Sequence, residues 1–274
     1  MMRSTRFSSR RWLAVLTAAA AAIITPLLAT PEAVGAPAAV SLPPVHAGFD
    51  YQIGQAYTPP AGVRVVTRDH DASPAAGLYN ICYVNAFQVQ PGAEGQWDAD
   101  LLLRDGSGKV VYDDGWGEAL LDLRTADKRQ RVAAKVGGWI DGCATKGFQG
   151  VEPDNYDSYT RSHGLLTAGA AKSYITLLAA RSHARGLAIA QKNTSALAGS
   201  RTQLGLDFAV AEECGTYSEC GDFTDAFGSN VIVIEYSKKG LSKACAGWGG
   251  QLSIVRRDVD VSAPGSSGYV RQTC

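Results

Sequence analysis

Residues 148–159 read FQGVEPDNYDSY, and this stretch determines the fold that we predict. A short apolar run, residues 148–151, stands directly before the acids Glu152, Asp154 and Asp157. A buried parallel strand of an α/β protein delivers acidic side chains to the rim of the fold in this way. Because side chains alternate along a strand, Glu152 and Asp154 share one face and can reach one pocket. The alternative for this stretch alone is an acidic loop that only caps the next helix.

Seven other apolar runs of strand length accompany this one. Most are separated by helical or loop segments, and each of the last five carries polar or charged residues at its C-terminal end. We therefore predict an α/β fold, a single-domain (β/α)8 TIM-type barrel of eight parallel strands. A doubly wound open sheet is the alternative, but the GxGxxG turn that it predicts is absent from the sequence. The eight runs lie near residues 63, 79, 119, 149, 187, 208, 231 and 252.

Helices and one inserted hairpin are expected between these strands. Residues 125–146 repeat apolar side chains at spacings of four, four and three residues, and Gly147 can end that helix. A second helix is expected to begin near Thr167 and to stop at Gly186. Apolar residues also flank the turn sequence DGSG at residues 105–108, which predicts a small antiparallel β-hairpin insertion.

The N-terminus has the composition of an export signal. Four arginines precede an apolar run over residues 12–29, and small residues follow near Ala36 and Ala38. An uncleaved membrane anchor is the alternative, and the pair Arg10 and Arg11 also resembles a twin-arginine signal. The expected boundaries are a signal peptide at 1–38, a Pro-, Ala- and Gly-rich linker or N-terminal segment at 39–60, and the barrel domain at 61–274.

Charge and cysteine content narrow the classes of function. Without residues 1–38 the chain has 22 basic and 25 acidic residues, so nothing suggests a nucleic-acid partner. Six cysteines, an even count in an exported chain, indicate disulfides, although they allow fifteen pairings. No CxxC or HExxH spacing supports zinc, and we expect neither metal nor cofactor. The pairs that we expect are Cys214 with Cys220 across a short loop, Cys245 with Cys274 at the C-terminus, and Cys82 with Cys143.

Acidic side chains at the strand ends would converge on one mouth of such a barrel. Several carboxylates close together repel one another, which costs free energy unless positive charges compensate. Such a cluster therefore indicates a functional role. Glycoside hydrolysis is one such role, because it uses two carboxylates of which one is kept protonated. Metal binding is the other, but residues 154–158 lack the glycine and closing glutamate of a calcium loop. Lys192 can pair with the acids, or could form a Schiff base. The candidate substrate-binding residues are Asp69, Tyr83, Glu152, Asn155, Lys192, Asn193, Glu213, Glu235 and Tyr236, and Trp116 is one of several aromatics that could stack on sugars.

Four motifs, taken in order, resemble the signature of the endo-α-1,4-polygalactosaminidase family of glycoside hydrolases. They read GVEPDNYDSY, GLAIAQKN, DFAVAEECGTYSEC and VIVIEY, and the match covers residues 79–258. The resemblance implies a barrel fold and a secreted enzyme that cuts α-1,4-linked galactosamine polymers. It also implies that the catalytic carboxylates are Asp154 and Glu212. Many family members have CYFSAG at the second strand, where this chain has CYVNAF at residues 82–87.

The function predicted from the sequence is cleavage of internal α-1,4 linkages in a galactosamine-containing polysaccharide outside the cell. Asp154 is expected to act as the nucleophile and Glu212 as the general acid/base of a retaining mechanism, because the longer side chain can reach the leaving oxygen. Glu213 and Glu235 are expected to keep Glu212 protonated. After removal of the signal we expect a monomer with no membrane partner. The alternatives are a barrel that binds polysaccharide without cutting it, and a glycosidase that acts on a different polymer.

Overall fold

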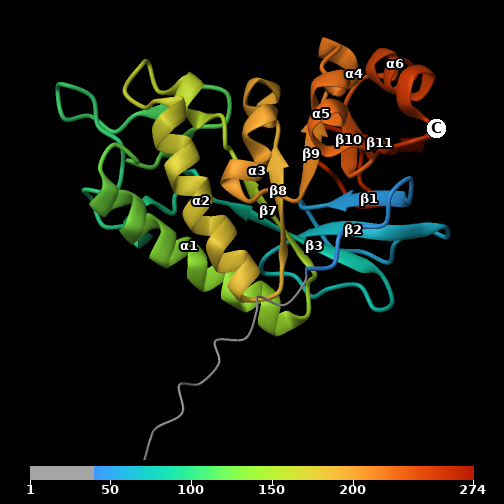
Figure 1. Ribbon diagram of the computed structural model, residues 1–274, viewed down its shortest axis with the longest axis horizontal. Coiled ribbons are helices and arrows are strands. Elements are labelled where there is room, and N and C mark those ends of the chain that lie inside the picture. Colours follow the sequence, from blue (N-terminus) through green and yellow to red (C-terminus); the bar gives the residue numbers. More distant parts are fainter. Residues whose placement is uncertain (1–39) are drawn as a thin grey trace, which may run out of the picture. The chain divides into compact units, whose positions relative to one another are not determined.

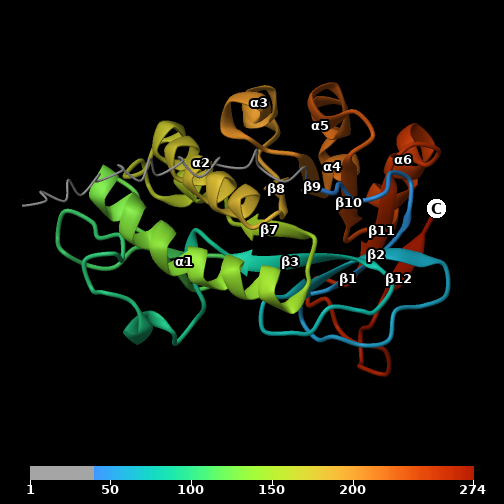
Figure 2. The same ribbon diagram turned by 60° about the horizontal axis from the view of Figure 1, so that its bottom comes forward.

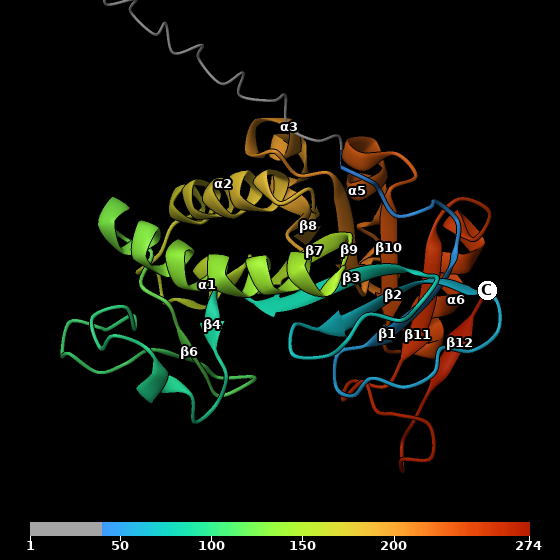
Figure 3. The ribbon, with the colours of Figure 1, turned by 90° about the horizontal axis from the view of Figure 1, so that it is seen from below.

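The computed structural model describes residues 40–274, so the expected signal peptide at 1–38 lies outside the described residues. Eight parallel strands, each hydrogen-bonded to the next, form a sheet that nearly closes into a barrel (Figures 1 and 3). The predicted fold class is therefore confirmed. The strands are β1 (Gly48–Gln52), β2 (Val63–Asp69), β3 (Tyr79–Asn85), β7 (Gly150–Asp154), β8 (Ala188–Lys192), β9 (Phe208–Glu212), β10 (Val231–Glu235) and β11 (Ser253–Arg257).

The first barrel strand lies inside the segment that we expected to be a linker. Strand β1 does not read as an apolar run because it contains Asp50 and Gln52, yet both side chains are buried. Asp50 accepts a hydrogen bond from Arg271 at 3.1 Å, and Gln52 accepts one from Arg68 at 3.0 Å. The prediction of a linker over residues 39–60 is wrong, because distant arginines satisfy the polar groups that this strand buries.

The apolar run near residue 119 is not a barrel strand. It forms β6 (Glu118–Leu120), the middle strand of a three-stranded antiparallel sheet with β4 (Gln88–Val89) and β5 (Tyr112–Asp113). This sheet is inserted between β3 and β7, and Figure 3 shows β4 and β6 beyond the arrowhead of β3. The predicted turn belongs to the same insertion, where Asp105 N donates to Lys109 O at 2.9 Å. The count of eight strands holds because β1 takes the place of this run.

Strands β1 and β11 stand at the two ends of the parallel sheet. Side chains, rather than backbone hydrogen bonds between the strands, join them. The backbone N–H of Ala47, just before β1, donates to the Ser253 hydroxyl on β11 at 2.9 Å. Arg257 of β11 and Arg271 both lie against the buried carboxylate of Asp50, at 3.5 and 3.1 Å. Arg271 opens β12 (Arg271–Thr273), which pairs antiparallel with β11. The C-terminal segment therefore helps to close the barrel.

Helices cover the outside of the barrel from β3 onward (Figure 2). Both predicted helices are present: α1 (Ala126–Lys146) is capped by the Thr125 hydroxyl and ended by Gly147 at φ 94°, and α2 (Ala168–Ala184) is capped by Thr167. The connections from β1 to β2 and from β2 to β3, residues 53–62 and 70–78, contain no helix. The remaining helices are α3 (Arg201–Leu204), α4 (Cys214–Tyr217), α5 (Cys220–Phe227) and α6 (Lys238–Trp248), with short 3-10 turns at Glu94–Gln96, Ser158–Arg161 and Ser195–Ser200.

Alternation along the strands separates two apolar cores. Val65, Ala190, Val210 and Ile234 belong to a cluster inside the barrel. Their neighbours along the strands point outward and pack with the helices, as Val151 does. Because inward positions recur every second residue, the next inward residue along each strand lies at the C-terminal rim. The barrel thus has an apolar interior with side chains of the strand ends above it.

All three expected disulfides are present. They join Cys82 to Cys143, Cys214 to Cys220, and Cys245 to Cys274. Disulfides of this kind form and persist in oxidising compartments. Over residues 40–274, no helix has both the length and the apolar character needed to cross a membrane.

Removing the disulfide between Cys245 and Cys274 is expected to destabilise the barrel seam. The bond connects α6 to the end of β12 across 29 residues of sequence. Without it the unfolded chain gains conformational entropy, which lowers the free energy of unfolding by about 3 kcal/mol. The double variant Cys245→Ser/Cys274→Ser should lose roughly 6–12 °C in Tm. Thermal unfolding with and without reductant checks this, and an unchanged Tm would show that β12 pairing alone holds the seam.

Candidate active site

A cavity of about 850 Å³ opens at the C-terminal ends of the barrel strands. Tyr83, Asp154, Glu212 and Tyr236 line it, and each continues the inward-facing positions of its strand. Asp69 lines the same cavity at the end of β2. Barrels of this class bind and transform ligands at this face. Of the acids that we expected to converge on one mouth, Asp154 and Glu212 line this cavity, and Glu152, Glu213 and Glu235 do not.

Three consecutive strands end in the same unusual backbone turn. Asn155 after β7, Asn193 after β8 and Glu213 after β9 have positive φ values of 66°, 46° and 56°. Residues other than glycine rarely adopt this region, and such positions cluster at functional sites. The turn lets Asn155 N donate to Asp154 Oδ1 at 2.7 Å, and Asn193 Oδ1 accepts from Glu212 N at 2.8 Å. Local backbone geometry thus fixes both candidate catalytic carboxylates.

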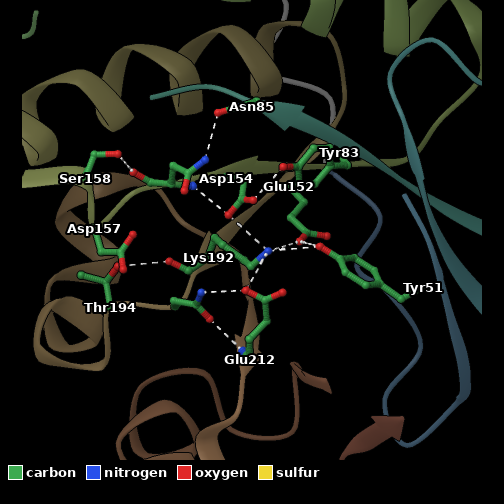
Figure 4. A network of polar contacts seen from close by, with 12 residues as sticks. Tyr51, Tyr83, Asn85, Glu152, Asp154, Asp157, Ser158, Lys192, Thr194 and Glu212 are labelled. Atoms are coloured by element: carbon green, nitrogen blue, oxygen red, sulfur yellow. Dashed lines mark hydrogen bonds and ion pairs between the residues drawn. The ribbon is translucent and has the colours of Figure 1, made fainter. Parts of the chain in front are cut away.

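Lys192 is the centre of the site, and Figure 4 shows its ammonium among three carboxylates. Its Nζ lies 3.0 Å from Glu152 Oε1, 3.2 Å from Asp154 Oδ1 and 3.3 Å from Glu212 Oε2. The side chain is 2% exposed. Burial opposes its charge, but the surrounding acids outweigh this and hold the pKa of Lys192 well above its usual value. The surrounding acids therefore favour the charged form of Lys192, which argues against a Schiff-base role because that role needs a neutral amine.

Asp154 is held in its ionised form. Burial alone would raise its pKa, but the charge of Lys192 and hydrogen bonds from Tyr83 and the Asn155 backbone lower the pKa below its usual value. The hydroxyl of Tyr83 donates to Asp154 Oδ2 at 2.7 Å, whereas Lys192 contacts the other carboxylate oxygen, Oδ1. Burial and the neighbouring carboxylate in turn raise the pKa of Tyr83, so the phenol stays a donor. The side chain of Asp154 is 17% exposed and open to the cavity.

Donors surround Glu212 on both carboxylate oxygens. Asn193 Nδ2 donates to Oε2 at 3.0 Å, and Lys192 lies close to the same oxygen. The hydroxyl of Tyr236, at the end of β10, donates to Oε1. Tyr236 and Asn193, both predicted as substrate-binding residues, therefore position Glu212 at the cavity wall.

Glu152 is deeper than the cavity and does not line it. Its side chain is fully buried, and Oε1 accepts hydrogen bonds from Tyr51 at 2.8 Å and from Lys192 at 3.0 Å. Burial is the largest effect on Glu152 and raises its pKa. Glu152 and Tyr51 support Lys192 from below, a role that differs from the substrate contact expected for Glu152.

The structure does not bring Glu235 to the cavity. Ile234 points into the barrel, so Glu235 points outward, where its carboxylate accepts from Gly215 N at 2.7 Å and from the Thr216 hydroxyl at 2.9 Å. Glu213 is half-buried outside the cavity lining, and burial together with Glu235 raises its pKa. Strand alternation turns Glu235 away from the Glu212 carboxylate, in contrast to our expectation, whereas the charge of Glu212 contributes to the raised pKa of Glu213.

A further carboxylate in the cavity was missed by the sequence reasoning. Glu118 of the inserted strand β6 is 8% exposed and lines the cavity, and its Oε2 accepts from Asn155 Nδ2 at 3.3 Å. Burial, followed by the charges of Asp154 and Asp113, raises the pKa of Glu118 to about 7 despite opposing contacts with Asn85 and Arg161. In the sequence this region was marked only by Trp116, one of the aromatics that could stack on sugars.

Replacing Glu118 with glutamine should remove a pH-dependent loss of stability. The pKa of Glu118 is about 7 in the folded chain against an ordinary value of 4.5, so folding favours the protonated carboxyl. That contribution is complete below about pH 4.5 and is lost as pH rises through about 7. The Tm of Glu118→Gln relative to the unaltered chain should therefore climb between pH 4 and pH 8. Parallel Tm profiles would contradict this assignment.

One group of side chains in the described residues has the spacing of a cation site. Ligand atoms of Asp69, His70 and Asp71 lie within 4.8 Å of one another. The His70 ring stacks on Trp139 at 5.2 Å, and Asp69 Oδ1 already accepts the Asp71 backbone N–H at 2.8 Å. Contacts within the protein therefore explain why these three side chains lie together, and no cation is needed to hold them.

A TIM-type barrel with two carboxylates beside one lysine at its C-terminal mouth fits the class of glycoside hydrolases. The profile of glycoside hydrolase family GH114 matches residues 29–274, and the chain belongs to this family. The resemblance found in the four motifs is thereby confirmed. A comparison with curated proteins found no match.

Solved structures support the same fold. Ega3 of Aspergillus fumigatus, in complex with galactosamine, matches with a TM-score of 0.69 and 23% identity, covering 86% of this chain and 98% of that one. The glycoside hydrolase domain of PelA from Pseudomonas aeruginosa matches with a TM-score of 0.57 and 14% identity, covering 80% of this chain and 98% of that one. At these identities the likeness shows the barrel fold.

Proposed function

We propose that this glycoside hydrolase cleaves internal α-1,4 linkages of a galactosamine-containing polysaccharide by a retaining mechanism with Asp154 and Glu212. The observation that carries the proposal is the lysine shared by the two carboxylates. Because Asp154 Oδ1 and Glu212 Oε2 lie 3.2 and 3.3 Å from Lys192 Nζ, these oxygens are at most 6.5 Å apart. Retaining enzymes hold their carboxyl groups about 5–5.5 Å apart and inverting enzymes roughly 6.5–9.5 Å, so this bound on the two nearest oxygens admits a retaining pair and excludes only the widest inverting separations.

The proposed roles combine the contacts that keep Asp154 ionised with the reach of the longer Glu212 side chain toward the leaving oxygen. Ionised Asp154 attacks the anomeric carbon while the bond to the leaving sugar oxygen breaks, and Glu212 gives that oxygen its proton. Water then attacks the glycosyl-enzyme bond, Glu212 takes up the proton, and Asp154 is released. Lys192 keeps Asp154 charged before attack, and Tyr83 and Tyr236 orient the two carboxylates through hydrogen bonds.

Charge in the cavity supports a cationic substrate. The carboxylate side chains in the lining outnumber its one arginine, Arg161, whose guanidinium lies 2.5 Å from Asp113 and 2.7 Å from Asp157. An acidic cleft concentrates a polymer that carries ammonium groups, as de-N-acetylated galactosamine does. The galactosamine complex of Ega3 agrees with this choice by analogy. The carboxylates that line the cavity are Asp69, Asp71, Glu118, Asp154, Asp157, Glu212 and Asp260.

Release of reducing ends tests the substrate assignment. The chain without residues 1–38 should cut partly deacetylated galactosamine polymer and leave starch and polygalacturonate intact. Cleavage of only a neutral or acidic polymer would overturn the substrate class. Tight binding to galactosamine polymer with no turnover over long incubation would favour a binding barrel instead.

We also propose that residues 1–38 direct export and are then removed, and that the released enzyme acts outside the cell as a monomer. The three disulfides support an oxidising destination. N-terminal sequencing of the secreted enzyme should begin near residue 37 or 39, and light scattering should give the mass of one chain.

A further inference from the structure

The inserted sheet brings an exposed aromatic side chain to the edge of the cavity. Trp116 lies in the turn between β5 and β6, lines the cavity and is 62% exposed. Leaving an indole this open to water costs free energy that burial would recover. Two residues further on, Glu118 also lines the cavity, with its carboxylate against Asn155, which directly follows Asp154. The turn therefore reaches from the cavity mouth to the catalytic pair.

Buried polar contacts hold this turn rigidly. Asp113 is 2% exposed, and its carboxylate accepts from Gly115 N at 2.9 Å and from Gln88 Nε2 at 3.1 Å. Arg161 Nε lies 2.5 Å from the same carboxylate. Gly117, at φ 67°, donates its N–H to Asp113 O at 2.8 Å and lets the chain reverse just before Glu118. A binding surface on this turn is thus preorganised.

Two buried amides beside the turn still have hydrogen-bonding capacity. Asn85 and Gln88, 7% and 1% exposed, both line the cavity. Within the described residues, Gln88 Oε1 has no hydrogen-bond partner, and Asn85 Nδ2 makes only a poorly aligned contact with the Glu118 carboxylate. Buried polar groups of this kind are normally satisfied, so an open donor and an open acceptor at a cavity wall indicate a polar ligand.

We propose that Trp116, Glu118, Asn85 and Gln88 form a sugar subsite next to the catalytic pair, which binds one free-amine hexosamine unit of the polymer. The indole of Trp116 covers one face of the sugar ring, and the carboxylate of Glu118 binds its ammonium group. The amides of Asn85 and Gln88 exchange hydrogen bonds with ring hydroxyls, one as donor and one as acceptor. This subsite deepens the proposed function and rests on it. It also gives a role to the CYVNAF sequence at residues 82–87, because Asn85 is the side chain that faces the sugar.

Variants of the turn test the subsite with defined galactosamine oligomers. Trp116→Ala and Glu118→Gln should each raise KM for free-amine oligomers about ten-fold, since the apolar contact of a sugar face with an indole and a charge-assisted hydrogen bond are each of that order. Both should change kcat less than KM and shift the position of cleavage along an oligomer. Trp116→Phe keeps an aromatic face and should restore most of the affinity.

Tyr112→Ala is the matched control, because Tyr112 is 41% exposed on β5 of the same sheet and does not line the cavity. Glu118→Gln should also lose any preference of the unaltered enzyme for free-amine over N-acetylated oligomers, whereas Tyr112→Ala should keep it. If Trp116→Ala and Glu118→Gln match Tyr112→Ala in KM and in cleavage position, the subsite is wrong. If the unaltered enzyme releases no reducing ends from galactosamine oligomers, the proposed function fails first.

Discussion

Asp154→Asn is expected to reduce kcat on galactosamine polymer by roughly 10⁴–10⁶-fold, the scale seen when a covalent nucleophile is lost. Glu212→Gln is expected to reduce it by about 10²–10⁴-fold, the typical contribution of a general acid/base. Both substitutions preserve side-chain shape, so circular dichroism and Tm should show a folded barrel. Initial rates of reducing-end release give the measurement.

An activated substrate separates the two roles. An aryl glycoside with a good leaving group needs little proton donation, so the first step should recover in Glu212→Gln and remain absent in Asp154→Asn. Glu213→Gln serves as the matched control, because Glu213 is the next residue and lies outside the cavity lining. A dead Glu213→Gln with a nearly normal Glu212→Gln would show that the wrong acid of the pair had been assigned.

Lys192→Met is expected to destabilise the barrel by about 3–5 kcal/mol and to abolish activity. The substitution leaves Glu152, Asp154 and Glu212 without the cation that lies 3.0–3.3 Å from each of them. Removing one partner of a buried ion pair leaves an uncompensated charge, which is costly. Lys192 lowers the pKa of Asp154, so in its absence the loss of stability should grow as pH rises and the carboxyls ionise. Chemical denaturation at pH 5 and pH 8 measures both effects.

Two companion variants locate the origin of that loss. Adding Glu152→Gln to Lys192→Met removes one buried carboxylate, so the double variant should recover part of the stability and none of the activity. Lys239→Met changes an exposed lysine at the start of α6 and should alter stability by less than about 0.5 kcal/mol. Equal losses for Lys192→Met and Lys239→Met would contradict a central role for the Lys192 cation.

The sequence alone predicted which acids line the cavity wherever an apolar run leads directly into an acid on the inward face of a strand. Residues 148–154 and 208–212 follow this pattern, and alternation from Val210 correctly places Glu212 at the cavity. The same argument would have excluded Glu235, because Ile234 next to it points into the barrel. That error came from counting acids at strand ends without assigning each one a face.

Other features depend on partners far apart in the sequence. Strand β1 could not be recognised because Asp50 and Gln52 look unsuited to a buried strand until the fold brings Arg271 and Arg68 to them on the outer face of β1. Glu118 lies on an insertion, so its closeness to Asn155 arises only from tertiary structure. Secondary-structure propensity and hydrophobic periodicity describe residues that are close in sequence. They cannot predict contacts between residues that only the tertiary structure brings together.

The most direct test of the account is the anomeric configuration of the first product. Proton NMR can follow the unaltered enzyme, without residues 1–38, as it hydrolyses a galactosamine oligomer. Retention through a glycosyl-enzyme on Asp154 predicts that the α anomer appears first and that the β anomer grows only later by mutarotation. A β anomer formed first would mean inversion and contradict the retaining roles of Asp154 and Glu212, and an oligomer left intact would contradict the galactosamine substrate itself.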